Sequence, residues 1–295
     1  MPSTPSPRRV VAETPVRQIE QTTILPEVTD VVEINRGVES ELARSALEAS
    51  QITSLDCDVE RYLDPPKDTP YFLEYAFHLI GDVRGKTVLD FGCGSGENVI
   101  PLAKKGADVI GIDLSPDLIN VARLRAEKYG VTADLRAASA YETGLPSHSV
   151  DVVFCIAVLH HLDIERAKSE VRRVLKPGGL FIVQEPVRFS WTVKQMRRIF
   201  PTKIEVSEDE YPLNAAQVAA LTNGFQMISS RSFRSIFAVA GLKFAKPFGK
   251  IVRQLDALAL RFIPGLSHYS GVRVMALREP LESAASEQDE AKIMA

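Results

Sequence analysis

Hydrophobic positions in the middle of the chain follow two repeats, one typical of β-strands and one typical of helices. Short runs rich in β-branched residues recur, and each is followed by a stretch whose apolar residues recur every three or four positions. The runs predict strands at residues 87–91, 108–112, 132–137, 152–157 and 180–184. The stretches between them predict helices at residues 97–105, 116–129 and 164–175. Strands that alternate with helices form a parallel sheet covered by helices.

The pattern is different on both sides of this region. Residues 1–35 have no clear period and are predicted to be disordered. Helical spacing over 39–51 and 69–81 predicts an N-terminal helical cap, residues 36–84. Beyond residue 185, two final strands are predicted at 225–231 and 272–278. About 40 residues separate these strands, more than a hairpin needs, so a helical insertion is expected at 232–270. An acidic tail, residues 280–295, is predicted to be disordered.

Together these elements predict an α/β protein. We expect a Rossmann-like, seven-stranded, mostly parallel sheet with helices on both faces, an N-terminal helical cap and a helical insertion between the last two strands. The domain that contains the sheet is expected to span residues 85–279.

Composition excludes several classes of protein. The chain has 295 residues, of which 45% are hydrophobic and 25% are charged, as is usual for a globular protein. The net charge of −3 gives no overall attraction to DNA. Three scattered cysteines suggest neither a disulfide framework nor a zinc site. No apolar run reaches the ~18 residues that span a bilayer. We therefore expect a cytoplasmic protein without a DNA partner.

A glycine-rich loop follows the first predicted strand. It reads Asp90-Phe91-Gly92-Cys93-Gly94-Ser95-Gly96 and leads into a helix. Ligands of open parallel sheets bind at the carboxyl ends of the strands, and glycines let the backbone approach them closely. Asp113 ends the second strand, where a carboxylate can accept hydrogen bonds from the two hydroxyls of a ribose. These residues predict a site for an adenosine compound.

The spacing of the loop favours a methyl donor over a dinucleotide. A dinucleotide motif would need a third glycine at position 97 or 99, where the chain has Glu97 and Val99. Glu97 would also place a negative charge where a helix N-terminus faces a pyrophosphate. A sulfonium compound with an amino-acid tail has no such conflict, and Asp90 can attract its ammonium group.

With these motifs the sequence resembles the class I S-adenosylmethionine-dependent methyltransferases, in particular the branch with quinone-biosynthesis and small-molecule enzymes. The resemblance covers about residues 70–185 and includes the run Arg173-Val174-Leu175-Lys176-Pro177-Gly178-Gly179. It implies S-adenosyl-L-methionine as cofactor. Ser139 departs from the aspartate that the family often has there. The implied cofactor-binding residues are Asp90, Phe91, Gly92, Cys93, Gly94, Gly96, Asp113, Leu114, Ser139, Ala140 and Ile156.

Two histidines follow the fourth predicted strand, at the opening of this site. Methyl transfer is an in-line displacement, and a base is needed only if the acceptor must lose a proton. His160 and His161 are the candidate catalytic residues, with His160 favoured, because histidine titrates in the right range. A purely structural role in shaping the cofactor pocket is an equal alternative. A metal site formed with Asp163 is disfavoured, since three neighbouring donors rarely converge on one ion.

The segment 231–264 contrasts with the acidic chain. It holds seven basic residues against one acidic residue, Asp256, and five phenylalanines. Such a segment can contact the inner face of a membrane, form a lid over an apolar substrate, or pack as a structural cap. We therefore expect a small-molecule or lipid-like acceptor, methylated on oxygen or carbon. The alternatives are a protein or RNA methyltransferase and a non-catalytic S-adenosylmethionine-binding protein.

Overall fold

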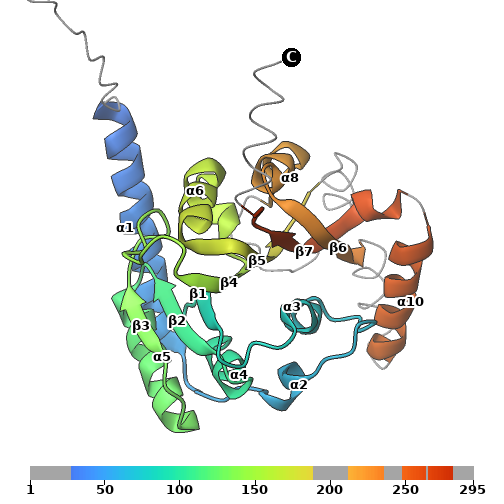
Figure 1. Ribbon diagram of the computed structural model, residues 1–295, viewed down its shortest axis with the longest axis horizontal. Helices are drawn as coiled ribbons and strands as arrows, with labels where there is room; N and C mark the ends of the chain where they lie inside the picture. The colour runs from blue at the N-terminus through green and yellow to red at the C-terminus, as the bar shows by residue number, and fades with distance from the viewer. Residues whose placement is uncertain (1–27, 189–211, 236–247, 264, 282–295) are drawn as a thin grey trace, which may run out of the picture. The chain divides into compact units, whose positions relative to one another are not determined.

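A seven-stranded sheet forms the centre of the computed structural model, which describes residues 28–188, 212–235, 248–263 and 265–281 (Figure 1). The strand order is β3-β2-β1-β4-β5-β7-β6. Neighbouring strands from β3 to β5 are parallel, and β7 is antiparallel to both β5 and β6. This order confirms the predicted Rossmann-like fold. The strands are β1 (Thr87–Phe91), β2 (Asp108–Asp113), β3 (Asp134–Ala137), β4 (Val150–Ile156), β5 (Leu175–Pro186), β6 (Gln226–Ser235) and β7 (Ser270–Arg278).

Helices cover both faces of the sheet, as predicted (Figure 1). On one face, α3 (Phe72–Ile80), α4 (Val99–Lys104) and α5 (Pro116–Tyr129) enclose a core that includes Val152 and Phe154. On the other face, α6 (Ile164–Val174) and α8 (Ala215–Thr222) enclose a core that includes Val153 and Cys155. Successive residues of β4 thus point to opposite cores, and the strand is apolar on both sides, as a central parallel strand should be.

The N-terminal helices differ from the prediction in extent. Helix α1 (Val28–Gln51) begins before residue 35, inside the segment predicted to be disordered. Val28, Val31 and Val32 already follow helical spacing there, a period that the sequence analysis overlooked. Helix α2 (Glu60–Leu63) was not predicted, and α3 begins only after Tyr71, whose backbone is extended. Residues 1–27 lie outside the described part of the chain.

Connections and strand ends also differ from the prediction. Residues 138–149 join β3 to β4 without a helix. β5 begins at Leu175, where α6 ends, because Leu175 pairs with Val150 before the glycines. β6 continues to Ser235, so the insertion before β7 is shorter than predicted. Its described elements are α10 (Gly249–Phe262) and the 3-10 helix η3 (Leu266–Tyr269), while residues 236–247 and the tail from 282 lie outside the description.

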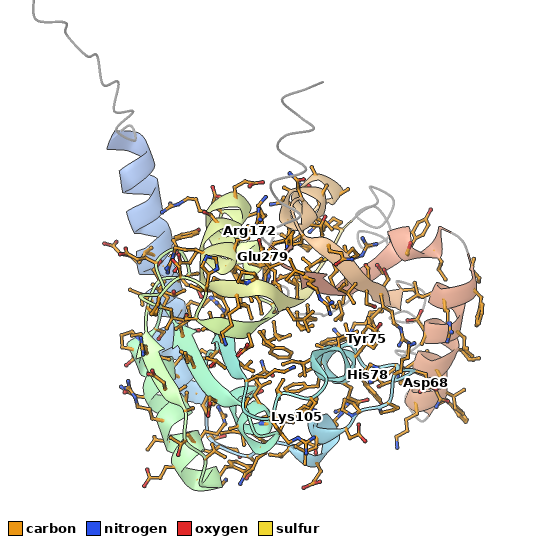
Figure 2. All side chains as sticks on the ribbon, viewed as in Figure 1. Asp68, Tyr75, His78, Lys105, Arg172 and Glu279 are labelled. Atoms are coloured by element: carbon orange, nitrogen blue, oxygen red, sulfur yellow. The ribbon has the colours of Figure 1, made fainter. Side chains whose placement is uncertain are left out.

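Polar contacts join the end of the sheet to its helices. Arg172 on α6 forms an ion pair with Glu279, directly after β7, with nitrogen and oxygen 2.6 Å apart (Figure 2). The Glu279 side chain is only 12% exposed, and its pairing with Arg172 ties the end of the last strand to α6. Within the described residues, none of the helices combines the length and the apolar character that crossing a membrane requires.

Candidate cofactor site

The glycine loop lies at the carboxyl end of β1, as predicted, and its backbone requires glycine. Gly92, Gly94 and Gly96 have φ angles of 77°, 50° and 81°, a region that side chains disfavour. A Cβ atom on Gly92 would lie 2.4 Å from Cγ2 of Val158, and one on Gly96 would lie 2.8 Å from Cβ of Ala122. The loop therefore packs tightly between α5 and the turn after β4.

Asp113 holds the loop against the end of β2. Its Oδ2 accepts a hydrogen bond from the amide of Gly94 at 2.9 Å, and its Oδ1 accepts one from the amide of Ser115 at 2.9 Å. Each carboxylate oxygen can accept a second hydrogen bond. Asp113 is only half-buried, so it can organise the loop and still bind the hydroxyls of a ribose.

Asp90 is the most unusual group of the site. Its side chain is buried, and within the described residues neither carboxylate oxygen has a hydrogen-bond partner. Burial, and then the charge of Asp113, raise the pKa of Asp90 to about 8. A buried carboxyl group without partners is costly to the fold. Its position directly before the glycine loop fits a carboxylate whose partner is a bound cation, such as the ammonium group of S-adenosylmethionine.

The structure brings most of the other predicted cofactor residues to the same edge of the sheet. Leu114 follows β2, Ser139 and Ala140 follow β3, and Ile156 ends β4. All four are half-buried rather than enclosed in the core.

Phe91 and Cys93 do not point into this site. Phe91 is fully buried in the core on the α6 face, opposite the face that carries Asp90, so its contribution is limited to its backbone. The family motif includes Phe91 because it lies in the loop segment, and it does not specify the face to which the side chain points. Cys93 is buried beneath the loop, where a Cβ on Gly111 would lie 3.1 Å from its Sγ.

His160 forms a buried pair with Glu185, a residue that the sequence analysis missed. Nδ1 of His160 lies 2.7 Å from Oε2 of Glu185. Oε1 of Glu185 accepts hydrogen bonds from the amides of Val158 and Leu159, at 2.9 and 2.7 Å. Glu185 thus shapes the 3-10 helix η1 (Leu159–His161). The signal for it was a charged residue at the carboxyl end of β5, the strand beside β4.

His161 and Asp163 differ from His160 in their surroundings. His161 is exposed, and its ring centre lies 4.0 Å from that of His160. Oδ1 of Asp163 caps α6 by accepting a hydrogen bond from the amide of Arg166 at 2.9 Å. No group of three potential ligands among the described residues is arranged to hold a metal ion.

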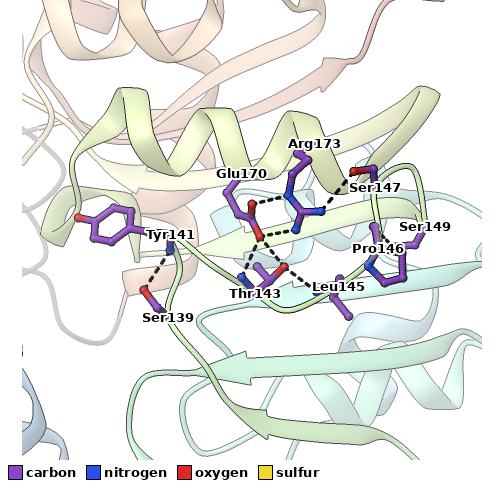
Figure 3. A network of polar contacts seen from close by, with 9 residues as sticks. All are labelled: Ser139, Tyr141, Thr143, Leu145, Pro146, Ser147, Ser149, Glu170 and Arg173. Carbon is purple, nitrogen blue, oxygen red and sulfur yellow. Dashed lines mark hydrogen bonds and ion pairs between the residues drawn. The ribbon is translucent and has the colours of Figure 1, made fainter. Parts of the chain in front are cut away.

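The connection that carries Ser139 and Ala140 is fastened to α6 by Glu170 (Figure 3). Oε1 of Glu170 accepts hydrogen bonds from the amide and hydroxyl of Thr143, at 2.8 and 2.6 Å, and Oε2 accepts one from Nε of Arg173 at 2.7 Å. Although burial opposes ionisation, the hydrogen bonds from Arg173 and Thr143 prevail and lower the pKa of Glu170 to about 2.

Replacing Glu170 by glutamine should lower the free energy of unfolding at pH 7 by about 2 kcal/mol. The carboxyl group has a lower pKa in the folded than in the unfolded chain. Its contribution to the free energy of unfolding is therefore complete above about pH 4.5 and is lost as the pH falls toward 2. Urea unfolding should therefore show a wild-type advantage that shrinks below pH 4.5. Glu165→Gln, at an exposed position of the same helix that pairs with Lys168, is the control and should change stability little. An equal loss in both variants would contradict the assignment.

Four aromatic residues of the N-terminal cap, Tyr62, Tyr71, Phe72 and Tyr75, are buried or half-buried. Tyr62 packs on Phe77, with ring centres 4.9 Å apart. Tyr75 is buried, and its hydroxyl lies 2.9 Å from Oγ of Ser229 on β6 (Figure 2). Tyr71 and Phe72 lie at the start of α3 and are half-buried.

A hollow of about 510 Å³ lies at the opposite edge of the sheet. Its lining includes Leu63, His78, Val83 and Lys105, and the last two directly precede β1 and β2 in the chain. Ligands of this fold bind at the carboxyl ends of the strands, so this hollow is not the cofactor site.

A family model described as a methyltransferase domain matches residues 89–183. This range contains the glycine loop, Asp113 and the two histidines. The chain contains a class I S-adenosylmethionine-dependent methyltransferase domain. The matched range includes most of β1, all of β2 to β4 and most of β5, the part of the sheet at which the candidate site lies.

Curated relatives resemble this methyltransferase domain and part of its surroundings. The ubiquinone biosynthesis O-methyltransferase of Cereibacter sphaeroides is 41% identical over 100 residues, which cover 34% of this chain and 40% of the relative. The enzyme of the same name from Sinorhizobium medicae is 31% identical over 163 residues, which cover 49% of this chain and 66% of the relative. The chain thus spans two fifths of the first relative's length and 66% of the second's.

Solved structures similar to the chain share less sequence with it. The geranyl diphosphate C-methyltransferase from Streptomyces coelicolor is 17% identical, covers 69% of this chain and 79% of its own, and has a TM-score of 0.49. The [4+2]-cyclase SpnF is 23% identical, covers 68% and 76%, and has a TM-score of 0.48.

Proposed function

We propose that this protein transfers a methyl group from S-adenosyl-L-methionine to an oxygen or carbon of a small-molecule or lipid-like acceptor. The observation that carries the proposal is Asp90, a buried carboxyl group without a hydrogen-bond partner in the described chain, placed directly before the glycine loop. A cationic ligand would remove the cost of this group. The relatives named as O-methyltransferases support a small-molecule acceptor.

Each part of the site has a role in this proposal. Asp90 binds the ammonium group of the cofactor, and Asp113 binds its ribose hydroxyls. Leu114, Ser139, Ala140 and Ile156 flank the adenine. When bound, S-adenosylmethionine supplies an activated methyl group, so the protein's task is to align the acceptor and to exclude water.

His160 accepts the acceptor's proton when the accepting atom carries one. Because Nδ1–H donates to Glu185, the neutral imidazole keeps its lone pair on Nε2. Glu185 fixes the orientation of the ring and stabilises the imidazolium that forms. The side chain of His160 is 4% exposed, which limits competition from water.

We predict that His160→Gln lowers kcat about 100-fold and leaves cofactor affinity unchanged. Release of S-adenosylhomocysteine would be followed over a range of pH with a panel of catechols and quinols as acceptors. His161→Gln is the matched control, since His161 is the exposed neighbour, and it should lose less than about threefold. If both variants kept the wild-type kcat and pH profile, His160 would have only a structural role.

Membrane contact through residues 231–264 is a further part of the proposal. Phe248, Ile251, Leu255, Leu258 and Phe262 recur at helical spacing along α10, and all are more than half exposed. Basic residues, including Lys250 and Arg261, lie on the same helix. An exposed apolar stripe with basic neighbours suits the interface of an anionic membrane.

A further inference from the structure

Three arginines lie over three aromatic rings where α3, β6 and α10 meet. The guanidinium carbon of Arg231 lies 5.0 Å from the ring centre of Tyr75, that of Arg234 lies 4.6 Å from Phe72, and that of Arg253 lies 5.6 Å from Tyr71. We name these six residues the arginine–aromatic cluster.

The guanidinium groups of this cluster lack ion-pair partners within the described residues. In the described part of the chain, no acidic side chain forms an ion pair with any of the three arginines. Asp68 attracts Arg231 only at longer range, and Asp256 accepts a hydrogen bond from the amide of Ser235 instead.

Like charges add to this imbalance. Burial lowers the pKa of the Arg231 and Arg234 guanidinium groups. Repulsion from Arg261 also lowers the pKa of Arg231, and repulsion from Arg253 also lowers the pKa of Arg234. Crowded guanidinium groups of this kind are stabilised by an anion, and their planar forks suit the oxygens of a phosphate or carboxylate.

The register of the sheet places Arg231 at the same edge and on the same face as the cofactor site, and Arg234 and Arg253 join it there through their contacts with Phe72 and Tyr71 at the start of α3. Asp90 pairs with Phe154 of β4, and the same row continues through β5 and β7 to Ser229 of β6. Arg231 and Arg234 lie beyond this row, toward the carboxyl edge. Tyr75 joins the two regions, because its helix α3 covers the face to which Asp90 and Phe154 belong.

The same register gives the separation between the two regions. Four strand spacings of about 4.8 Å lie between β1 and β6, which gives roughly 19 Å. A single ligand that reached both regions would have to be elongated. Most of its length would lie beside the apolar residues of α3.

We propose that the arginine–aromatic cluster binds the anionic group, a phosphate or a carboxylate, of an elongated methyl acceptor whose accepting atom lies at the cofactor site. This inference rests on the proposed function and names the class of its acceptor. The aromatic rings of the cluster hold the guanidinium planes in place, so that the anion meets preorganised donors.

Isothermal titration calorimetry with inorganic pyrophosphate and with dodecyl phosphate tests the cluster. We expect saturable binding of both probes by the wild type, tighter for dodecyl phosphate. The double variant Arg234→Gln/Arg253→Gln should bind at least about tenfold more weakly. Arg234→Lys/Arg253→Lys, which keeps the charge, should retain part of the affinity and shows whether a loss reflects misfolding. Arg84→Gln is the control, since Arg84 pairs with Asp82 at the opposite edge. Equal binding by the wild type and the double glutamine variant would overturn the proposal.

Two further measurements are needed. One distinguishes a lipid headgroup from a free acceptor as the source of the anion, and the other distinguishes failure of this inference from failure of the proposed function. Co-sedimentation with phosphatidylcholine vesicles, with and without phosphatidylglycerol, detects a lipid headgroup. Binding only to anionic vesicles, dependent on both arginines and without affinity for dodecyl phosphate, would overturn the acceptor assignment. Titration with S-adenosylhomocysteine should give equal affinities for the wild type and the double variant. If the wild type did not bind it, the proposed function would fail whatever the phosphate result.

Discussion

Asp90→Asn should weaken the binding of both S-adenosylmethionine and S-adenosylhomocysteine by about a thousandfold, and it should stabilise the ligand-free protein. Loss of one member of a buried charge pair costs about 4 kcal/mol, which corresponds to that factor. Both compounds carry the ammonium group that Asp90 is proposed to bind, so both should be affected. Stability should rise because the wild type has a buried carboxyl group without partners in the described chain.

The pKa of Asp90 shows why Asp90→Asn should stabilise the ligand-free protein. The pKa of Asp90 is about 8 in the folded protein, against an ordinary value of 3.8. Between these values the folded protein binds more protons than the unfolded chain, so the free energy of unfolding falls as the pH rises. At pH 7 this loss amounts to roughly 4 kcal/mol. Asparagine removes the ionisation but leaves a buried amide, so we expect a gain of about 2 kcal/mol.

Calorimetry and urea unfolding of the two proteins test both halves of this prediction. Binding of the cation should release close to one proton from wild-type Asp90 at pH 7, which appears as a dependence of the binding enthalpy on the buffer. Asp108→Asn is the matched control, because Asp108 is exposed at the amino end of β2. If only S-adenosylmethionine lost affinity, Asp90 would face the sulfonium instead. Unchanged affinity for both would remove the basis of the proposed function.

Those parts of the fold that depend on local patterns were predicted well from the sequence. Helix α5 begins at residue 116, as predicted, where Ser115 caps it by accepting a hydrogen bond from the amide of Leu118. The glycines and Asp113 are neighbours in space because parallel strands bring their carboxyl ends together. A short motif and a sheet direction were therefore enough to locate the loop and its acid.

Features that depend on distant contacts could not be predicted in this way. Glu185 lies 25 to 27 residues from the three groups that donate hydrogen bonds to it, and no local spacing connects them. The arginine–aromatic cluster joins α3 to β6, which are far apart in sequence and meet only through the strand order. Its basic residues were visible as a charged segment, but their aromatic partners and their common face with Asp90 were not.

Glu185→Ala should lower the free energy of unfolding by roughly 4 kcal/mol, more than the substitutions of Glu170 and Asp90 are expected to change it. The substitution leaves the part-buried amide of Val158, the buried amide of Leu159 and the Nδ1–H of His160 without an acceptor, and each buried donor costs about 1–3 kcal/mol. Glu185→Gln keeps one oxygen for the two amides, so it should lose only about 1–2 kcal/mol. Urea unfolding of both variants at neutral pH measures this difference.

Glu185→Ala should also weaken cofactor binding, because Val158 connects Glu185 to the glycine loop. Val158 donates its amide to Glu185, and its side chain packs where a Cβ on Gly92 would lie. A loosened turn at Val158 removes one wall of the loop, so we expect about tenfold weaker binding of S-adenosylhomocysteine in Glu185→Ala. Glu279→Ala, which breaks the ion pair with Arg172 after β7, is the control and should leave this affinity unchanged. A Glu185→Ala protein within about 1 kcal/mol of the wild type would show that Glu185 does not hold the turn after β4.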